Sequence, residues 1–161
     1  MNPIKNNHNL LGACGLYCGA CYHYLVSFPE HKHLLETAKR KGYKLDGYTC
    51  KGCWSGELYI HPGCAQCQIR ECVESKAILY CGQCSDFPCG RLKSFQCDGR
   101  IHHLDILDNL NEINLKGIDQ WLSEQDSRWR CLCGFKFSWY EELCQNCGSP
   151  LISYGAKLKL S

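Results

Sequence analysis

The sequence predicts a small α+β fold stabilised by metal ions, in which an irregular, α-rich and cysteine-rich domain precedes a C-terminal zinc ribbon. Three observations carry this prediction. Cysteine accounts for 16 of the 161 residues. Most of the cysteines occur in pairs separated by one or two residues, which is a spacing typical of metal sites. A cysteine-free segment with helical periodicity separates twelve of them from the last four.

The cysteine distribution divides the chain into three parts. Residues 9–97 form the predicted multi-metal domain, residues 98–129 a helical connecting segment, and residues 130–150 the zinc ribbon. The length suits one compact domain with a small satellite. Within the first part, helical spacing and stop signals predict short helices at His31–Gly42, Glu71–Leu79 and Gly90–Phe95.

The composition excludes several classes of protein. No apolar run approaches the about 18–20 residues of a membrane helix, and the opening MNPIKNNHNLLGACG lacks the uninterrupted apolar stretch of a secretory signal. The formal net charge is +2 with cysteine counted as neutral, and each divalent ion bound by four thiolates lowers it by about two. A basic stripe for nucleic acid is therefore not expected. We expect a cytoplasmic protein with protein partners rather than nucleic acid or a membrane.

The cysteine spacing favours metal ligation over disulfides. Two thiolates on a tight turn can both point at one ion, whereas structural disulfides join residues distant in the sequence. In a reducing cytosol disulfides are the weaker alternative. Five pairs have two intervening residues: Cys18/Cys21, Cys50/Cys53, Cys64/Cys67, Cys81/Cys84 and Cys144/Cys147. The pair Cys131/Cys133 has one, and Cys14, Cys72, Cys89 and Cys97 complete the set. Four ligands per ion give at most four zinc ions.

The first cysteines, Cys14, Cys18 and Cys21, have the C-x3-C-x2-C spacing with which radical S-adenosylmethionine enzymes bind an iron–sulfur cluster. Those enzymes need alternating strands and helices downstream, whereas this chain continues with more cysteines. We therefore interpret the three residues as ligands of a closed zinc site that a fourth ligand completes. An iron–sulfur cluster used in electron transfer is the alternative. A metal site with an open, water-filled position in an enzyme is a third hypothesis.

A cysteine pattern recurs within the first part. Cys64-x2-Cys67-x4-Cys72 is followed, 17 residues later, by Cys81-x2-Cys84-x4-Cys89. Each copy offers three ligands, so each needs a fourth from elsewhere in the chain. Three histidines, His23, His61 and His102, lie near enough in the sequence to replace a cysteine. A solvated or hydrogen-bonded role is the simpler interpretation of each.

The connecting segment carries apolar residues at helical spacing. The stripe comprises Ile101, Leu104, Leu107 and Leu110, and then Ile118, Trp121 and Leu122. These positions predict two amphipathic helices hinged around Asn114–Gly117 that pack on the metal domain.

The last four cysteines have the spacing of a zinc ribbon. They lie in Cys131-Leu-Cys133-Gly and Cys144-Gln-Asn-Cys147-Gly, with ten residues between Cys133 and Cys144. They predict a closed, tetrahedral and structural site, in which the glycines let backbone amides turn toward sulfur. Rubredoxin-type iron is the alternative, although both of its pairs usually have two intervening residues. Between the knuckles, FKFSWY (Phe135–Tyr140) is the best strand candidate.

Four stretches of the sequence together resemble one prokaryotic cysteine-rich family. They are ACGLYCGACYHY, CKGCW, CQIRECVESKAILYCGQCSDFPCGRL, and RWRCLCG with FSWYEELCQNCG. The family is known as domain of unknown function 3795 and is described as zinc-binding. The resemblance implies ligand roles for Cys14, Cys18, Cys21, Cys50, Cys53, Cys67, Cys72, Cys81, Cys84 and Cys89. Cys64 and Cys97 match it less closely. It implies a prokaryotic, often anaerobic, source and no particular reaction.

These features predict a zinc-binding protein whose ions are mainly structural and which acts as a binding or adaptor module for proteins. An iron–sulfur redox protein is the alternative, and a metal-dependent enzyme is the third reading. Trp54, Tyr59 or Trp139 would form a contact surface or cover the metal sites.

Overall fold

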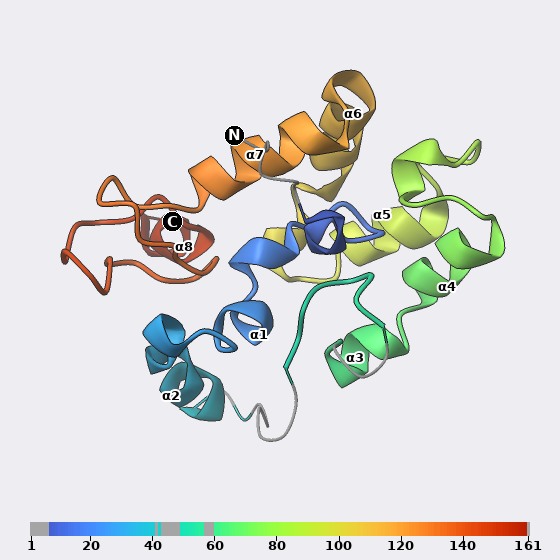
Figure 1. The fold of residues 1–161 in the computed structure, drawn as a ribbon. Helices are drawn as coiled ribbons and strands as arrows, with labels where there is room; N and C mark the ends of the chain where they lie inside the picture. Colours follow the sequence, from blue (N-terminus) through green and yellow to red (C-terminus); the bar gives the residue numbers. More distant parts are fainter. Residues whose placement is uncertain (1–6, 41, 43–48, 57–59, 161) are drawn as a thin grey trace, which may run out of the picture.

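The computed structural model describes residues 7–40, 42, 49–56 and 60–160 (Figure 1). This part of the chain consists of short helices joined by irregular loops. Its β structure is confined to three isolated antiparallel bridges, Leu11–Tyr17, Arg130–Lys136 and Leu143–Pro150. The α-rich expectation is confirmed. Among the described residues, no helix has the length and apolar character that crossing a bilayer requires.

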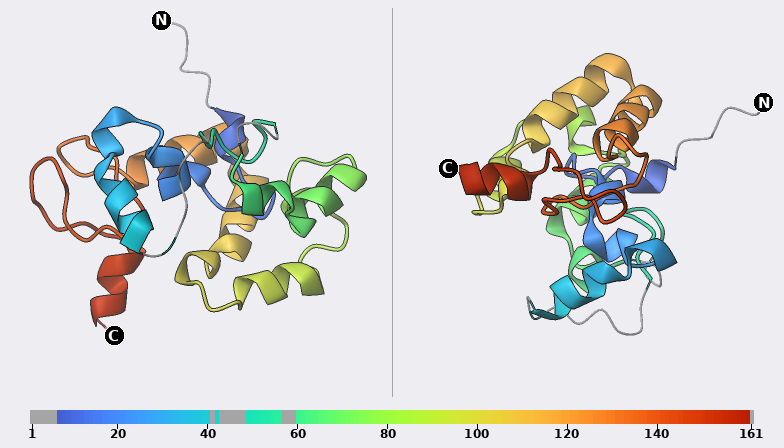
Figure 2. Two further views of the ribbon diagram at one scale, coloured as in Figure 1. Left: turned by 90° about the horizontal axis from the view of Figure 1, so that it is seen from below. Right: turned by 90° about the vertical axis from the view of Figure 1, so that its left-hand side faces the viewer.

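An N-terminal arm runs to α2, and its part up to α1 lies in the middle of the molecule, with the C-terminal loops on one side and helices α3–α5 on the other (Figures 1 and 2). It contains two 3-10 helices, η1 (His8–Leu10) and η2 (Cys18–Ala20), which flank a tight turn at Gly15. It continues through α1 (Tyr22–Leu25), η3 (Pro29–His31) and α2 (His33–Arg40). The predicted helix over residues 31–42 is therefore shorter at both ends, and Gly42 follows it with a φ of 77°. Lys41 lies outside the described residues.

The next segment carries seven of the cysteines on or beside four short helices. These are α3 (Pro62–Ala65), α4 (Gln68–Ser75), η5 (Cys81–Gln83) and α5 (Gly90–Gln96). Helix α5 agrees with the prediction. Helix α4 begins three residues before Glu71 and ends before Leu79, because Ala77 adopts a left-handed φ of 53° that no helix continues through.

The connecting segment forms η6 (Ile101–His103) and two longer helices, α6 (Ile106–Lys116) and α7 (Ile118–Arg128). Gly117, with a φ of 87°, makes the hinge. The predicted pair of helices is confirmed. Its apolar stripe packs on the N-terminal arm, except for Leu104, which is 53% exposed.

Contacts between the helix pair and the arm form the core of the protein. The Trp121 ring is fully buried and meets the edge of Tyr17 at a centroid distance of 6.1 Å. The Asn109 side-chain amide donates to the Gly15 carbonyl at 2.9 Å. A Cβ atom at Gly15 would lie 2.7 Å from Leu110 Cγ, so the turn at Gly15 is pressed directly against α6.

Residues 130–153 form two tight turns and irregular loops, followed by α8 (Tyr154–Leu160). The strand expected over Phe135–Tyr140 is wrong. Lys136 makes an isolated bridge, and the Trp139 amide donates to the carbonyl of Ala20 on the arm at 3.3 Å instead of to a neighbouring strand. The segment is therefore held by the N-terminal arm rather than by a sheet.

Candidate metal centres

Two similar turns present the last four cysteines. In the first, the Gly134 amide donates to the Cys131 carbonyl at 2.8 Å, and in the second, the Gly148 amide donates to the Cys144 carbonyl at 2.8 Å. Gly134 and Gly148 have φ values of 88° and 74°. Because residues with a Cβ rarely adopt this conformation, the glycines after Cys133 and Cys147 let each turn close. This role was expected from the sequence.

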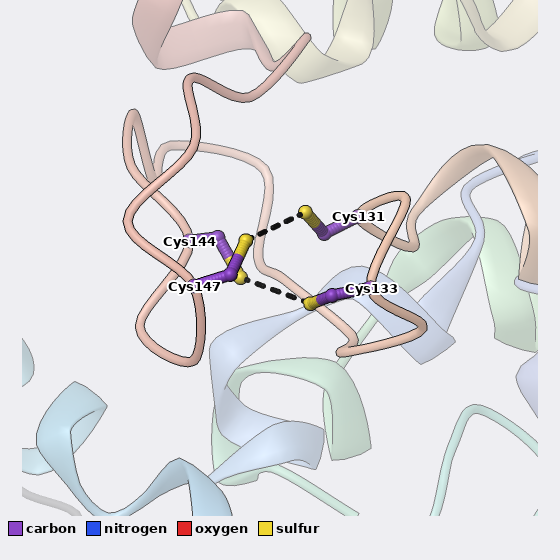
Figure 3. A group of neighbouring side chains, drawn as sticks. All are labelled: Cys131, Cys133, Cys144 and Cys147. Atoms are coloured by element: carbon purple, nitrogen blue, oxygen red, sulfur yellow. Dashed lines mark hydrogen bonds between the residues drawn. The ribbon is translucent and has the colours of Figure 1, made fainter.

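The four sulfur atoms converge on one point between the turns (Figure 3). All lie within 4.8 Å of one another. The Sγ atoms of Cys131 and Cys147 are 3.5 Å apart, and those of Cys133 and Cys144 are 3.6 Å apart. Four thiolates around a tetrahedral zinc ion, each about 2.3 Å from it, lie about 3.8 Å from one another. The donor set therefore fits a metal ion with four thiolate ligands.

Hydrogen bonds to sulfur favour the thiolate form at two of these residues. The hydroxyl and amide of Ser149 and the thiol of Cys131 lower the pKa of Cys147 to about 6. The Asn146 side-chain amide and the Phe135 backbone amide lower the pKa of Cys133. At Cys131 the amide of Cys133 also lowers the pKa, but burial and the three other thiols outweigh it and raise the pKa to about 12. Four adjacent thiolates repel one another, so a cation is needed to hold them together.

Residues 130–150, the segment predicted to form the zinc ribbon and called the ribbon from here on, pack on the rest of the molecule through polar and aromatic contacts. The Ser138 hydroxyl donates to the Ala20 carbonyl at 2.9 Å, and His33 Nε2 lies 2.6 Å from Glu141 Oε1. Asp126 on α7 pairs with Arg130 at 2.9 Å and with Lys136 at 2.7 Å. These contacts orient the four-cysteine site relative to the arm and α7.

The aromatic residues proposed as a contact surface have different environments. Trp139 is only 6% exposed, so it belongs to the interior. Trp54 is half-buried and packs against the core. Tyr59 lies outside the described residues.

His102, a candidate ligand by its sequence position, has a packing role. Its ring stacks on Trp139 at a centroid distance of 4.2 Å, and its Nδ1 lies 2.7 Å from the Tyr140 hydroxyl. Burial, together with the neighbouring His103 and Arg100, lowers the pKa of His102 to about 3. The neutral imidazole therefore joins η6 to the ribbon.

We expect acid to weaken this contact. Because the folded-state pKa of His102 is about 3 and its ordinary value is 6.5, the unfolded chain binds a proton between these pH values that the folded protein does not. The free energy of unfolding should therefore fall with decreasing pH below 6.5, by up to about 1.4 kcal/mol per pH unit from this group. Urea unfolding of the wild type and of His102→Gln, at pH 7, 6 and 5, measures the effect.

The glutamine variant keeps a polar group beside Tyr140 and does not titrate. Acid release of metal acts on both proteins and cancels in the comparison. Equal loss of stability with falling pH in the two proteins would contradict a buried, neutral His102.

None of the sixteen cysteines forms a disulfide in this structure. The twelve N-terminal thiols are brought together only in part. Burial, and then the neighbouring thiol of Cys53, raise the pKa of Cys14, with smaller effects of Cys67 and Cys81. Burial, followed by Cys53 and Cys21, likewise raises the pKa of Cys18. Cysteines from different pairs are therefore close enough for the charge of one thiolate to raise the pKa of another.

The spacing of these thiols differs from that in the ribbon. Among the described residues, the ribbon cysteines are the only group of three or more potential metal ligands whose donor atoms all lie within 4.8 Å of one another. Any three of the N-terminal thiols thus include a pair farther apart than this. Cys97 is exposed at the C-terminal end of α5.

The hydrogen bonds at several N-terminal thiols follow the ribbon's pattern. Burial raises the pKa of Cys21 to about 12, but the amides of His23 and Tyr24 hydrogen-bond to its sulfur and oppose this. The Leu16 amide does the same at Cys14. In each case an amide two residues further on points at the sulfur, as the Ser149 amide does at Cys147. Backbone amides aimed at sulfur support a thiolate ligand.

The other two candidate histidines lie together, His23 in α1 of the arm and His61 at the start of α3. The rings of His23 and His61 are in contact, with centroids 3.9 Å apart. His61 Nδ1 accepts a hydrogen bond from the Gly63 amide at 3.1 Å, which caps α3. Burial and the neighbouring His61 lower the pKa of His23 to about 4. Both imidazoles are therefore held in the neutral form, the form that binds metals.

Sequence reasoning missed two cations beside the thiols. Arg70 on α4 is buried and donates to the Cys53 carbonyl, and Lys76 Nζ lies 3.1 Å from Cys84 Sγ. A signal for Arg70 was present, because it lies between Ile69 and Val73 on the buried side of a helix. A charged residue in such a position needs a partner.

Comparison with protein families supports the resemblance seen in the sequence. The family described as "Protein of unknown function (DUF3795)" matches residues 10–94, more than half of the chain. The matched region includes eleven of the cysteines and ends before Cys97, the helix pair and the ribbon. No curated protein and no solved structure matches this chain. The chain belongs to the DUF3795 family of proteins of unknown function.

Proposed function

We propose that the protein is a zinc-binding module whose ions are mainly structural and which serves as a binding or adaptor unit for other proteins in the cytoplasm. The convergence of four ribbon thiols carries this proposal. A zinc ion with four cysteine ligands has no coordination position for water or a substrate, so its role is to hold the chain in place. We further propose that N-terminal cysteines bind additional ions, up to a total of four.

Exposed apolar residues on and beside the ribbon support a protein partner. Leu132, Leu143 and Ile152 are 107%, 56% and 84% exposed, and Leu132 lies between two of the ribbon cysteines. Apolar side chains on a rigid, metal-held loop can enter a partner's surface without the cost of ordering that loop. Nucleic acid is a weaker proposal, because a net charge of +2 falls once thiolates bind metal.

One observation favours an iron–sulfur redox protein as the second candidate function. Several N-terminal thiols raise the pKa of one another, so they are near neighbours. Any three of them nevertheless include a pair whose sulfur atoms are more than 4.8 Å apart. An iron–sulfur cluster distributes its thiolate ligands over several irons, whereas one zinc ion draws four thiolates together. The wider spacing therefore suits a cluster.

Metal analysis of anaerobically purified protein separates the two functions. Zinc, iron and acid-labile sulfide are measured per chain, and the visible spectrum is recorded. We expect colourless protein with several zinc ions. Stoichiometric iron with sulfide and a broad absorption near about 400 nm would replace the structural-zinc proposal with the redox one for the N-terminal thiols.

A further inference from the structure

We propose that the ribbon is a peroxide-sensitive site, whose four thiolates are oxidised to two disulfides with release of the bound ion. The bonds join Cys131 to Cys147 and Cys133 to Cys144, so both link the first cysteine turn to the second. This inference adds a reversible modification to the structural role of the ribbon. It rests on the proposed function for the ion, whereas the pairing of the sulfurs follows from the geometry of the chain.

The sulfur atoms of the ribbon form two close pairs across the site (Figure 3). The Sγ atoms of Cys131 and Cys147 are 3.5 Å apart, and those of Cys133 and Cys144 are 3.6 Å apart. Groups held in an aligned geometry with their reacting atoms about 3–3.5 Å apart react much faster than free groups in solution. Each pair takes one cysteine from each turn. The geometry therefore favours bonds between the turns.

Each pair combines one accessible and one buried cysteine. Cys133 and Cys147 are exposed, whereas Cys131 and Cys144 are 8% and 3% exposed. An oxidant in solution therefore reaches one member of each pair, while the other member is shielded. Oxidant-sensing cysteines share this arrangement, in which an accessible thiolate lies next to a second thiol that resolves the oxidised sulfur. Cys133 and Cys147 accordingly react with the oxidant, and their buried partners complete the disulfides.

The oxidant is hydrogen peroxide, which takes two electrons from each pair of sulfurs. The exposed thiolate attacks one peroxide oxygen, the O–O bond breaks, and a sulfenic acid and a hydroxide ion result. The buried thiolate then attacks the sulfenic sulfur, which forms the S–S bond and expels a second hydroxide ion. Two protons from solvent convert the hydroxide ions to water. Because zinc has no redox chemistry, all the electrons come from sulfur, and two such reactions leave no thiolate to hold the ion.

Disulfides within one turn are the competing products. A bond between Cys131 and Cys133 would enclose only Leu132, and a bond between Cys144 and Cys147 would enclose only two residues. The bonds between the turns enclose ten or more residues each. A disulfide that closes a longer loop stabilises a folded chain more. Bonds between the turns are therefore favoured by stability as well as by distance, and they keep the turns joined after the ion is released.

Disulfide mapping of the wild-type protein tests the pairing. Zinc-loaded protein is treated with hydrogen peroxide, free thiols are blocked, and the disulfides are located by digestion and tandem mass spectrometry. We expect both bonds between the turns to form as one zinc ion per chain is released, and a dithiol with zinc to restore the starting state. Cys97→Ser removes an exposed thiol outside the ribbon, and it should give the same ribbon products as the wild type.

Hydrogen exchange tests the structural consequence of the bonds. Because both disulfides join the turns, we expect the amides of residues 131–148 to exchange more slowly in the oxidised, zinc-free protein than in reduced protein stripped by a chelator. Equal exchange rates in the two forms would contradict turns that stay joined.

Other products of the peroxide reaction overturn the inference. Disulfides within a turn, or between the ribbon and an N-terminal cysteine, would contradict the pairing. Ribbon thiols that stay reduced while Cys97 is oxidised would contradict the peroxide sensitivity. The zinc count before treatment tests the proposed function separately. If the ribbon binds no ion but forms these two disulfides, the proposed function and the release of the ion fail, and the pairing is confirmed. If a zinc-loaded ribbon resists peroxide, the reverse holds.

Discussion

Replacing Cys144 by serine is expected to release the ribbon's metal ion and to unfold residues 130–151. Cys144 is 3% exposed, and its sulfur lies 3.6 Å from that of Cys133. In the described structure this segment has isolated bridges in place of a sheet, so the proposed ion would be its main internal support. Binding of a structural zinc ion is worth about 10–16 kcal/mol in small zinc domains, and most of that free energy would be lost.

Metal content and hydrogen exchange measure this effect together. We expect one metal ion fewer per chain and fast amide exchange across the ribbon, with protection kept in α6 and α7. Ile152→Ser, which changes an 84% exposed side chain in the same region, is the matched control and should change neither quantity. A Cys144→Ser protein with its full metal content and a protected ribbon would rule out the closed four-thiol site.

Replacing Trp121 by alanine should give the largest loss of stability in the metal-free part of the core. The ring is fully buried between α7 and the arm and meets the edge of Tyr17. Its removal takes away apolar burial and leaves a cavity, which together cost about 3–5 kcal/mol. Because Trp121 Nε1 has no hydrogen-bond partner among the described residues, the loss is one of packing.

Urea unfolding at constant metal saturation measures this loss. Leu115→Ala, on the neighbouring α6 and 84% exposed, should change the free energy of unfolding by less than about 0.5 kcal/mol. In Trp121→Phe the smaller ring fills part of the space, so the free energy of unfolding of this variant should lie between those of Trp121→Ala and Leu115→Ala. Similar stability of Trp121→Ala and Leu115→Ala would show that the helix pair does not rest on the arm.

The helices of the connecting segment were predictable because the spacing of their apolar residues, which lie near one another in the sequence, determines which face is buried. Apolar residues at helical intervals on both sides of Gly117 give two helices and the hinge between them. The cluster of four C-terminal thiols was predictable for a similar reason, since Cys131/Cys133 and Cys144/Cys147 each lie on one turn. In these cases the residues that determine the structure are near one another in the sequence.

Two features could not be predicted, namely that Phe135–Tyr140 forms no strand and which thiols neighbour one another in the N-terminal part. Both depend on contacts between residues distant in the sequence. Nothing near Phe135–Tyr140 indicates that the Trp139 amide will pair with Ala20. Likewise, the spacing of Cys50 and Cys53 does not show that the chain returns to the arm, where the Ala13 amide hydrogen-bonds to the Cys53 sulfur. Arg70 was missed because its significance lies in being buried, and burial of a charge follows from tertiary packing.

The burial of the turn at Gly15 has a kinetic consequence. Cys14 precedes this turn, α6 presses on it, and the Asn109 side chain holds its carbonyl at 2.9 Å. An ion bound by Cys14 would therefore exchange with solution only when α6 lifts away, so the opening rate of the helix pair would limit exchange there. The ribbon, with Cys133 and Cys147 exposed, would exchange its ion without that opening. One chain would then hold metals with two different lifetimes, and the slower ones would have to be acquired before α6 closes during folding.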